Sequence, residues 1–207
     1  MALLKKLDIF WRHCDIKTAF KIMTLDAVIR AKLLYGLDSA QLTPSQQRRL
    51  KVFQLKGLRK ILNMTTTYVE RNNSNAEVFR KANELIQNET PEGKTVKHVQ
   101  EFVKIYKNSR MKRLARIYQL PREHPVRYIT FAANTPNPNL ITPWIPPNRR
   151  VGRPRFKWVT ETLSDMWTNL ASIHPHLSPT FDREGNERQH ALIKREINSP
   201  EPRFLFK

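Results

Sequence analysis

This sequence contains few cysteines, few glycines and few acidic residues, and each shortage excludes a class of protein. Its one cysteine, Cys14, permits no intramolecular disulfide and is typical of a reducing compartment. The five glycines are scattered and form no glycine-rich loop that would cradle a phosphate. The longest apolar stretch, residues 20–37, is interrupted by charged residues. We therefore expect no membrane-spanning helix and no membrane partner.

The residue patterns that carry catalysis are also missing. A polymerase that uses two metal ions needs paired carboxylates, but the sequence has no Asp-Asp and no Asp-x-Asp. The six histidines show no metal-ligand spacing with Cys14. No serine or cysteine nucleophile motif occurs. We predict that the chain is not an enzyme and binds no metal or cofactor.

Positive charge is what the sequence has in excess. It carries 37 Lys and Arg against 18 Asp and Glu, a net charge of +19. The excess is shared evenly by the two halves of the chain, so a folded protein of this composition repels itself until a polyanion neutralises it. Nucleic acid is the usual polyanion, because the release of condensed counterions drives binding. The alternative interpretation is a solvated basic surface without a partner.

Helical periodicity dominates the sequence up to about residue 120. Asp15 is a candidate N-cap for a long helix over 16–37, whose apolar residues surround most of its circumference and predict the most buried element. Thr43 and Pro44 have the pattern of an N-cap followed by a first helical residue. The other segments with helical periodicity are residues 3–11, 44–62, 76–86, 94–119, 156–173 and 186–197. Segment 3–11 reads as a first core helix or as a weak organellar targeting helix.

The character of the chain changes at Pro121. More than half of the 14 prolines lie within residues 121–154, which excludes regular helix from most of that segment. Residues 126–131 fit a short β-strand or an extended arm. We therefore predict a mainly α protein with a helical core over residues 1–120, a Pro-rich basic arm over 121–155 and C-terminal helices over 156–207.

Two of the predicted helices carry many cations and no nearby acids. No acidic residue occurs between Asp38 and Glu70, or from Phe102 to Arg122. Such faces are usually just solvated, but without acidic partners they favour contact with phosphates. The candidate phosphate-contacting residues are Arg48, Arg49, Lys56, Arg59, Lys60, Lys104, Lys107, Arg110, Lys112, Arg113 and Arg116.

A third basic element lies in the arm, where residues 149–155 read RRVGRPR. A Gly-Arg-Pro core flanked by arginines fits an extended strand that follows a nucleic-acid backbone. It differs from an AT-hook, which has Arg immediately before the Gly where this chain has Val151. A generic phosphate- or RNA-binding arm is favoured over minor-groove reading or a simple linker. The candidate contacts are Arg149, Arg150, Arg153, Arg155 and Lys157.

Residues 26–62, DAVIRAKLLYGLDSAQLTPSQQRRLKVFQLKGLRKIL, resemble the segment that follows the palm in LINE-type (non-LTR) retrotransposon reverse transcriptases. In that family a helix ending in LLYG precedes a helix with an FQ-x-x-x-LRKIL signature. Residues 110–120, 124–125 and 149–158 resemble the family's later RRL, HP and GRPR-x-x-W patterns. The resemblance implies a thumb-like helical bundle and an RNA-binding region. The fingers and the palm with its Asp-Asp hairpin have no counterpart in this sequence.

These observations favour a non-catalytic RNA-binding structural subunit of a ribonucleoprotein particle, and an organellar ribosome most of all. Its expected partners are structured RNA, ribosomal RNA by preference, and neighbouring proteins of a large assembly. Its expected location is intracellular, with the mitochondrion favoured over nucleus or cytoplasm. Two alternatives stay open: a C-terminal fragment of an active LINE-type polymerase, and a protein that binds duplex DNA or chromatin.

Overall fold

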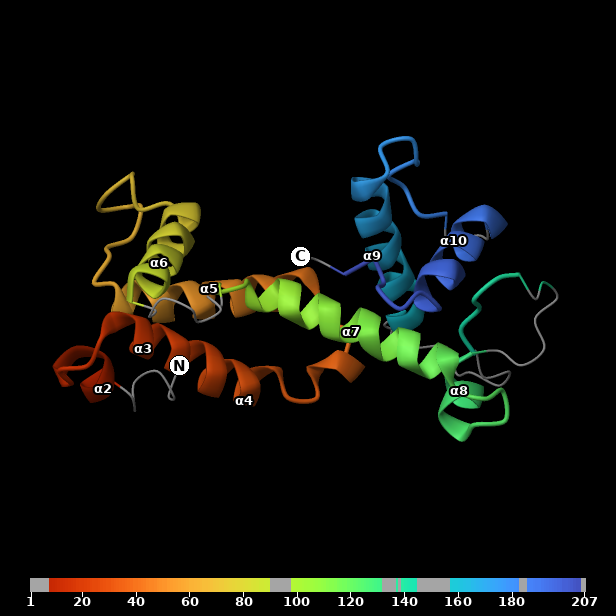
Figure 1. Ribbon diagram of the computed structural model, residues 1–207, viewed down its shortest axis with the longest axis horizontal. Coiled ribbons are helices and arrows are strands. Elements are labelled where there is room, and N and C mark those ends of the chain that lie inside the picture. Colours follow the sequence, from red (N-terminus) through yellow and green to blue (C-terminus); the bar gives the residue numbers. More distant parts are fainter. Residues whose placement is uncertain are drawn as a thin grey trace. The chain divides into compact units, whose positions relative to one another are not determined.

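The computed structural model describes residues 8–89, 98–131, 137, 139–144, 157–182 and 186–205. This part of the chain is mainly α-helical, as predicted (Figure 1), and its only strand-like feature is an isolated bridge between Phe131 and Pro143. No described helix is both long enough and apolar enough to cross a membrane. Unit 1 is formed by Met1–Tyr35 with Leu42–Ile105, and unit 2 by Gly36–Gln41 with Tyr106–Lys207.

These two units do not coincide with the segments 1–120, 121–155 and 156–207 expected from the sequence, which stay predictions. The chain passes from unit 1 to unit 2 inside helix α7 (Phe102–Gln119), and the short segment Gly36–Gln41 belongs to unit 2. Helical periodicity shows that α7 has a buried face, but it does not show which elements cover that face. Met111 and Leu114 of α7 pack into the core of unit 2, so the boundary falls before them.

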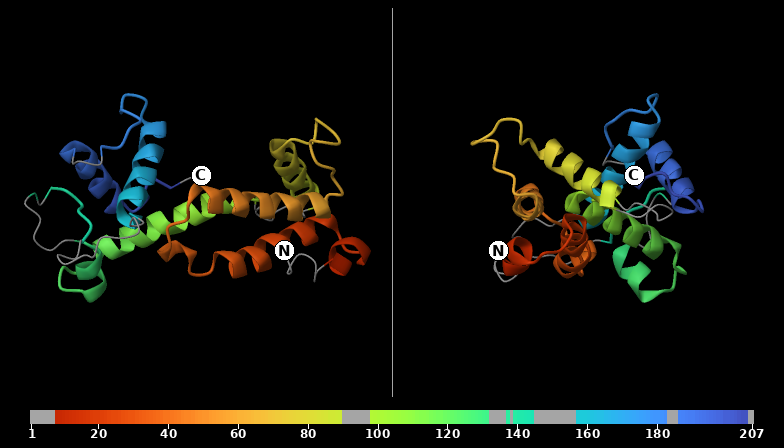
Figure 2. Two further views of the ribbon diagram at one scale, coloured as in Figure 1. Left: turned by 180° about the vertical axis from the view of Figure 1, so that it is seen from behind. Right: turned by 60° about the vertical axis from the view of Figure 1, so that its left-hand side comes forward.

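Unit 1 is a set of helices around one apolar core. Its elements are α2 (Asp8–His13), α3 (Thr18–Thr24), the π-helical turn η1 (Leu25–Ile29), α4 (Arg30–Leu34), α5 (Pro44–Ile61) and α6 (Asn75–Glu89). The continuous α3–η1–α4 segment lies beside α5 in both views of Figure 2. Ile22, Ile29, Leu58, Val78 and Ala82 are completely buried in this core.

The helix expected over 16–37 is shorter and contains a π turn. It begins at α3, where Lys17 occupies the N-cap position without a side-chain hydrogen bond, so Asp15 is not the cap. The backbone N–H of Arg30 donates to the carbonyl of Leu25. This i→i+5 bond accommodates about one extra residue in the turn.

One side of this segment is exposed, which corrects the expectation that it would be the most buried element. Ile22, Leu25 and Ile29 face the core, whereas Phe20 and Val28 are more than half exposed. The sequence shows apolar residues around the helix, but the described residues of unit 1 cover only one side of it.

Gly36 ends the helical segment because its backbone is left-handed, with a φ of 70°. A Cβ added there would meet no atom within 4 Å. The preference for glycine is therefore conformational, since an L side chain costs about 1 kcal/mol in this backbone region.

The start of α5 confirms the predicted cap. The Thr43 N–H donates to Gln46 Oε1 at 2.8 Å, and the Gln46 N–H donates to Thr43 Oγ1 at 3.3 Å. Pro44 occupies the first helical position, where its missing N–H costs nothing. The cap thus fixes where the basic helix begins.

Unit 2 packs most of α7 against the C-terminal helices. Its further elements are η2 (a 3₁₀ turn, Leu37–Ser39), α8 (Pro125–Thr130), α9 (Trp158–Ile173) and α10 (Glu187–Ile197). Met111, Leu114, Met166 and Ile193 are completely buried in a core that also includes Phe204. Hydrogen bonds from side chains of α7 and α9 attach the segment Gly36–Gln41 to these helices.

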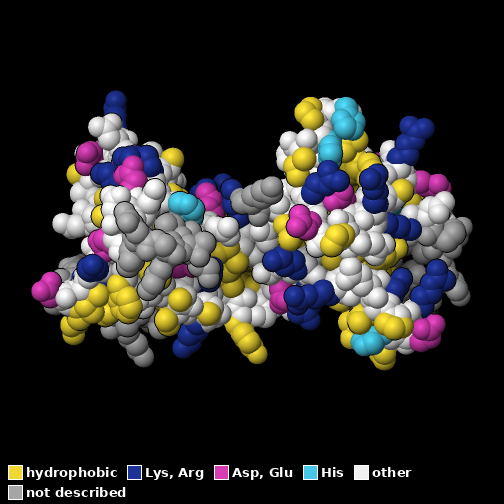
Figure 3. All heavy atoms as spheres, in the orientation of Figure 1, with side chains coloured by type: hydrophobic (Ala, Val, Ile, Leu, Met, Phe, Trp, Pro, Cys, Tyr) yellow, Lys and Arg dark blue, Asp and Glu magenta, His cyan; other side chains and the backbone are white. Residues whose placement is uncertain are grey.

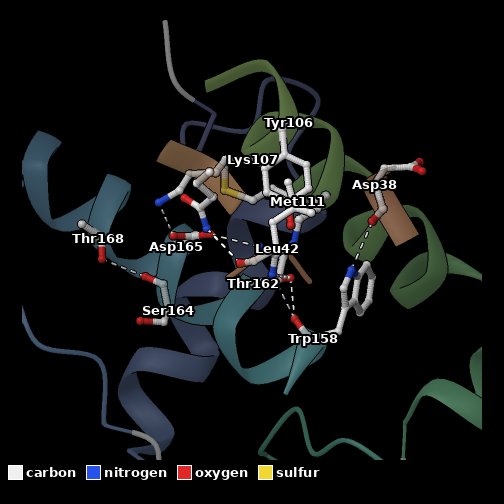
Figure 4. Close-up of polar contacts among 12 residues, drawn as sticks. Asp38, Leu42, Tyr106, Lys107, Met111, Trp158, Thr162, Ser164, Asp165 and Thr168 are labelled. Atoms are coloured by element: carbon white, nitrogen blue, oxygen red, sulfur yellow. Dashed lines mark hydrogen bonds and ion pairs between the residues drawn. The ribbon is translucent and has the colours of Figure 1, made fainter. Parts of the chain in front are cut away.

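Side chains of α7 and α9 hold the Gly36–Gln41 segment through its backbone. The Trp158 indole N–H donates to the Asp38 carbonyl at 3.1 Å, as Figure 4 shows. The Tyr106 hydroxyl donates to the Ala40 carbonyl at 2.8 Å. Both bonds satisfy carbonyl groups of a loop that has no regular ladder, which fixes the position of Asp38 in unit 2.

The strand or extended arm expected over 126–131 is wrong, because Pro125–Thr130 forms helix α8. His124 is its N-cap, and its Nδ1 accepts from the Val126 N–H at 3.2 Å. Pro125 at the first helical position removes no hydrogen bond and presets the helical φ. Proline therefore starts a helix here, where the composition of the segment indicated its absence.

The stability of unit 2 should depend on pH through His190. The ring is buried, its Nδ1 accepts from the Ile141 N–H at 3.0 Å, and burial together with nearby Lys194 lowers its pKa. The unfolded chain has an ordinary histidine pKa of about 6.5, so below that pH it binds more protons than the folded chain does. The free energy of unfolding should therefore decrease as the pH falls from 7 to 5. The loss is about 1.4 kcal/mol for each unit by which folding lowers the pKa.

Urea denaturation at several pH values measures this effect. The His190→Gln variant keeps a hydrogen-bond acceptor but does not titrate, so its stability should change less over the same range. An identical pH dependence in both proteins would show that another group is responsible.

Candidate nucleic-acid interface

The exposed cations of α5 lie opposite the stripe that packs into the core of unit 1. Arg48, Arg49 and Lys56 are exposed, whereas Leu58 is completely buried. Arg49 and Lys56 are seven residues apart, which places them on nearly the same side of the helix, and Lys60 follows one turn later. At 1.5 Å per residue, Arg48 to Lys60 spans about 18 Å. We call Arg48, Arg49 and Lys56 the α5 row.

The α5 row makes no ion pair within the described residues. Helix α6 of the same unit behaves differently. Arg80 pairs with both Glu77 and Glu84, and the Lys81 Nζ lies 3.9 Å from Glu77 Oε1. Pairs at this spacing are the usual arrangement for a solvated helix face. The α5 row lacks that neutralisation.

Arg59, another predicted phosphate contact, has a structural role. Its Nη2 donates to the Asn73 carbonyl at 3.1 Å and to Asn75 Oδ1 at 2.9 Å. The side chain therefore ties the end of α5 to the turn that begins α6. Lys60 lies beside it and is half-exposed.

The six cations predicted on α7 occupy three kinds of environment. Lys107 lies 2.8 Å from Asp165 Oδ1 on α9 (Figure 4), so much of its charge is neutralised. Arg110 is buried. The exposed members are Lys104 in unit 1 and Lys112, Arg113 and Arg116 in unit 2.

The prediction that Arg110 contacts phosphate is wrong, because its side chain is only 1% exposed. Its Nη2 donates to Thr162 Oγ1 at 2.8 Å, and its Nη1 lies 3.6 Å from Asp165 Oδ2. The sequence does contain a signal for this burial. Arg110 stands four residues from both Tyr106 and Leu114, which are buried on the same face of the helix.

The exposed cations of α7 in unit 2 border a pocket of about 450 Å³. Lys112, Arg113 and Arg116 line it together with Asp38, whose Oδ2 lies 3.0 Å from Arg113 Nη1. The rest of the lining is Ser109 together with the apolar side chains of Ile117 on α7, Leu120 just after it and Val126 on α8. Asp38 is more than 70 residues away from these cations in the sequence, so no sequence pattern places it there.

The cations of the arm, Arg149, Arg150, Arg153 and Arg155, lie outside the described residues, and their predicted contacts stay predictions. Lys157 is described, and it occupies the exposed N-cap position of α9 without a side-chain hydrogen bond to the helix.

Tyr68, Tyr128 and Trp144 have exposed rings on which bases could stack. Tyr68 is 99% exposed, Tyr128 56% and Trp144 42%. Within the described residues no group of three or more His, Cys, Asp or Glu side chains has the arrangement of a metal site. The described surface therefore offers exposed cationic side chains and exposed aromatic rings for contact with a ligand.

Figure 3 shows Lys and Arg side chains at many separate places on the face in view. Their number accords with the net charge of +19. No family model matches the chain, and neither a curated protein nor a solved structure matches it. The function is therefore inferred from the fold and from the environments of the cations.

Replacing Arg110 should destabilise the fold, whereas replacing an exposed neighbour should not. We expect Arg110→Ala to lower the free energy of unfolding by about 2–4 kcal/mol, because it removes buried hydrogen bonds and leaves a cavity. Lys112→Ala, two residues away on the exposed face, should change it by less than about 0.5 kcal/mol. Chemical denaturation measures both. A stable Arg110→Ala variant with weakened nucleic-acid binding would show that Arg110 contacts nucleic acid after all.

Proposed function

We propose that this chain is a non-catalytic RNA-binding subunit of a ribonucleoprotein particle, whose α5 row and exposed α7 cations contact phosphates. The observation that carries the proposal is the contrast between α5 and α6. On α6, Arg80 and Lys81 are neutralised by acids of the same helix, whereas the α5 row has no acidic partner among the described residues. Adjacent like charges repel, so this arrangement gains stability when phosphates neutralise it.

Lys112 and Arg116 on α7 repeat this arrangement in unit 2. They stand four residues apart on a helix, both are exposed, and neither pairs with a described acid. Like charges at that spacing cost a helix a few tenths of a kcal/mol. Each unit therefore presents a set of cations that a phosphate backbone would satisfy.

The choice of RNA as the polyanion follows from the resemblance to the thumb and downstream region of LINE-type reverse transcriptases. Cations on helices contact the phosphates of RNA and DNA alike, so charge by itself does not separate the two. The even distribution of charge and the basic, Pro-rich sequence of residues 121–155 fit a protein that stays inserted in folded RNA. A ribosome-like particle of an organelle, the mitochondrion above all, is the setting we propose.

The second candidate function is the thumb-side portion of a LINE-type polymerase. The residues 53–62, FQLKGLRKIL, favour it because they match the family's signature in order and spacing. In that case the same α5 row would face template and primer while a separate palm supplied the chemistry.

Removing the α5 row should weaken RNA binding and reduce its salt dependence. Each lost phosphate contact lowers the slope of log K against log salt by about 0.7 for single strands. The variant Arg48→Ala/Arg49→Ala/Lys56→Ala should therefore lower the slope by about 2 units. Fluorescence anisotropy with a labelled structured RNA at several salt concentrations measures it.

The matched control removes three exposed cations of the same unit from other places: Lys17→Ala/Arg71→Ala/Lys81→Ala. It changes the net charge equally and should leave most of the slope intact. Equal losses in the two variants would mean that net charge acts without a defined surface. The same assay with duplex DNA measures the DNA-binding alternative, and tighter binding to DNA than to RNA would favour it.

A sedimentation experiment distinguishes a subunit of a ribonucleoprotein particle from a portion of a LINE-type polymerase. The native protein should move with ribosomal RNA in a gradient and lose that mobility after RNase treatment, whereas DNase should have no effect. Its recovery only within a longer polypeptide that carries an Asp-Asp palm would assign it to the second candidate.

A further inference from the structure

The pocket beside α7 in unit 2 combines features that a phosphate backbone alone does not require. Its volume, about 450 Å³, falls within the range of about 300–1,000 Å³ that small-ligand sites occupy. Its lining combines cationic side chains with the apolar side chains of Ile117, Leu120 and Val126. We propose that the pocket receives one unpaired nucleotide of the bound RNA, and this inference rests on the proposed function.

The phosphate of that nucleotide would lie against Lys112 and Arg116. Both side chains are exposed and line the pocket, and neither pairs with a described acid. Arg113 is committed to Asp38 at 3.0 Å and therefore contributes less charge to a ligand. Two cations one helical turn apart suit a single phosphate group.

The base would lie on the apolar part of the lining. Ile117 is 8% exposed, Leu120 is half-buried, and Val126 at the start of α8 is 40% exposed. A duplex keeps its bases stacked inside and offers only its backbone and groove edges, which would leave this apolar surface in water. An unpaired base offers a flat face that covers it.

Asp38 supplies a hydrogen-bond acceptor at the base edge. Its carboxylate is oriented by Arg113, and its backbone carbonyl is fixed by the indole of Trp158. A carboxylate accepts from the exocyclic amino group of a base such as cytosine, whereas uracil presents a carbonyl oxygen at the same position. The pocket should therefore prefer cytosine to uracil.

A variant that fills the pocket tests whether the pocket receives an unpaired nucleotide. Val126→Trp places an indole on the apolar surface, and Ile129→Trp is the matched control, since Ile129 is exposed on the same helix but does not line the pocket. Affinities are measured for a 12-nucleotide single strand and for a 12-base-pair RNA duplex. We expect Val126→Trp to weaken single-strand binding roughly tenfold, the effect of losing one stacked base. Duplex binding should change less than twofold, and Ile129→Trp should change neither.

Each other outcome overturns a defined part of the argument. If the unmodified chain binds both RNAs and Val126→Trp weakens both equally, or neither, the pocket takes no unpaired nucleotide and the proposed function stands. If the unmodified chain binds neither RNA, the proposed function itself fails. Circular dichroism confirms that the variants are folded.

A separate comparison of two oligonucleotides tests whether Asp38 recognises the base. The unmodified chain should bind oligo(C) several-fold more tightly than oligo(U), and Asp38→Asn should reduce that preference, because an amide also donates to uracil O4. Equal affinity of the unmodified chain for the two oligonucleotides would remove Asp38 from base recognition.

Discussion

Unit 2 keeps the guanidinium of Arg110 almost entirely out of water, which requires α7 and α9 to stay within hydrogen-bonding distance of each other. Removing such a charge from water is expensive unless its N–H groups find acceptors. On α9, Thr162 Oγ1 accepts a hydrogen bond from Arg110, and the Asp165 carboxylate forms an ion pair with it at 3.6 Å. The same helix begins with Trp158, which holds the loop that carries Asp38. The position of the pocket lining therefore depends on the α7–α9 contact.

Among the described residues, some cations hold the fold and others face solvent without an acidic partner. Arg59, Lys107 and Arg110 are engaged by carbonyl, amide, hydroxyl or carboxylate oxygens of their own unit. The α5 row, and Lys112 with Arg116, have no such partner among the described residues. A basic composition alone does not separate the two groups. The proposed RNA contacts rest on the second group, because no acid of the described residues neutralises its charge.

Several elements follow from local sequence rules. The capping box at Thr43, the position of α5 and the starts of α9 and α10 depend on hydrogen bonds and apolar spacing within a few residues, so they were predictable. Helix α8 was also locally encoded, by His124 and Pro125, but the surrounding prolines indicated an extended chain. The burial of Arg110 could have been read from its place between Tyr106 and Leu114.

The sequence by itself determined the helical class, the excess of positive charge and the basic faces of two helices, because each depends on composition or on spacing along one helix. Only the tertiary structure decided which cations are engaged, where α7 passes from one unit to the other, and that Asp38 stands beside Arg113. These outcomes depend on contacts between residues distant in the chain. No periodicity encodes which helix covers a given face, so the pocket exists only once α7, α8 and the Gly36–Gln41 segment have packed together.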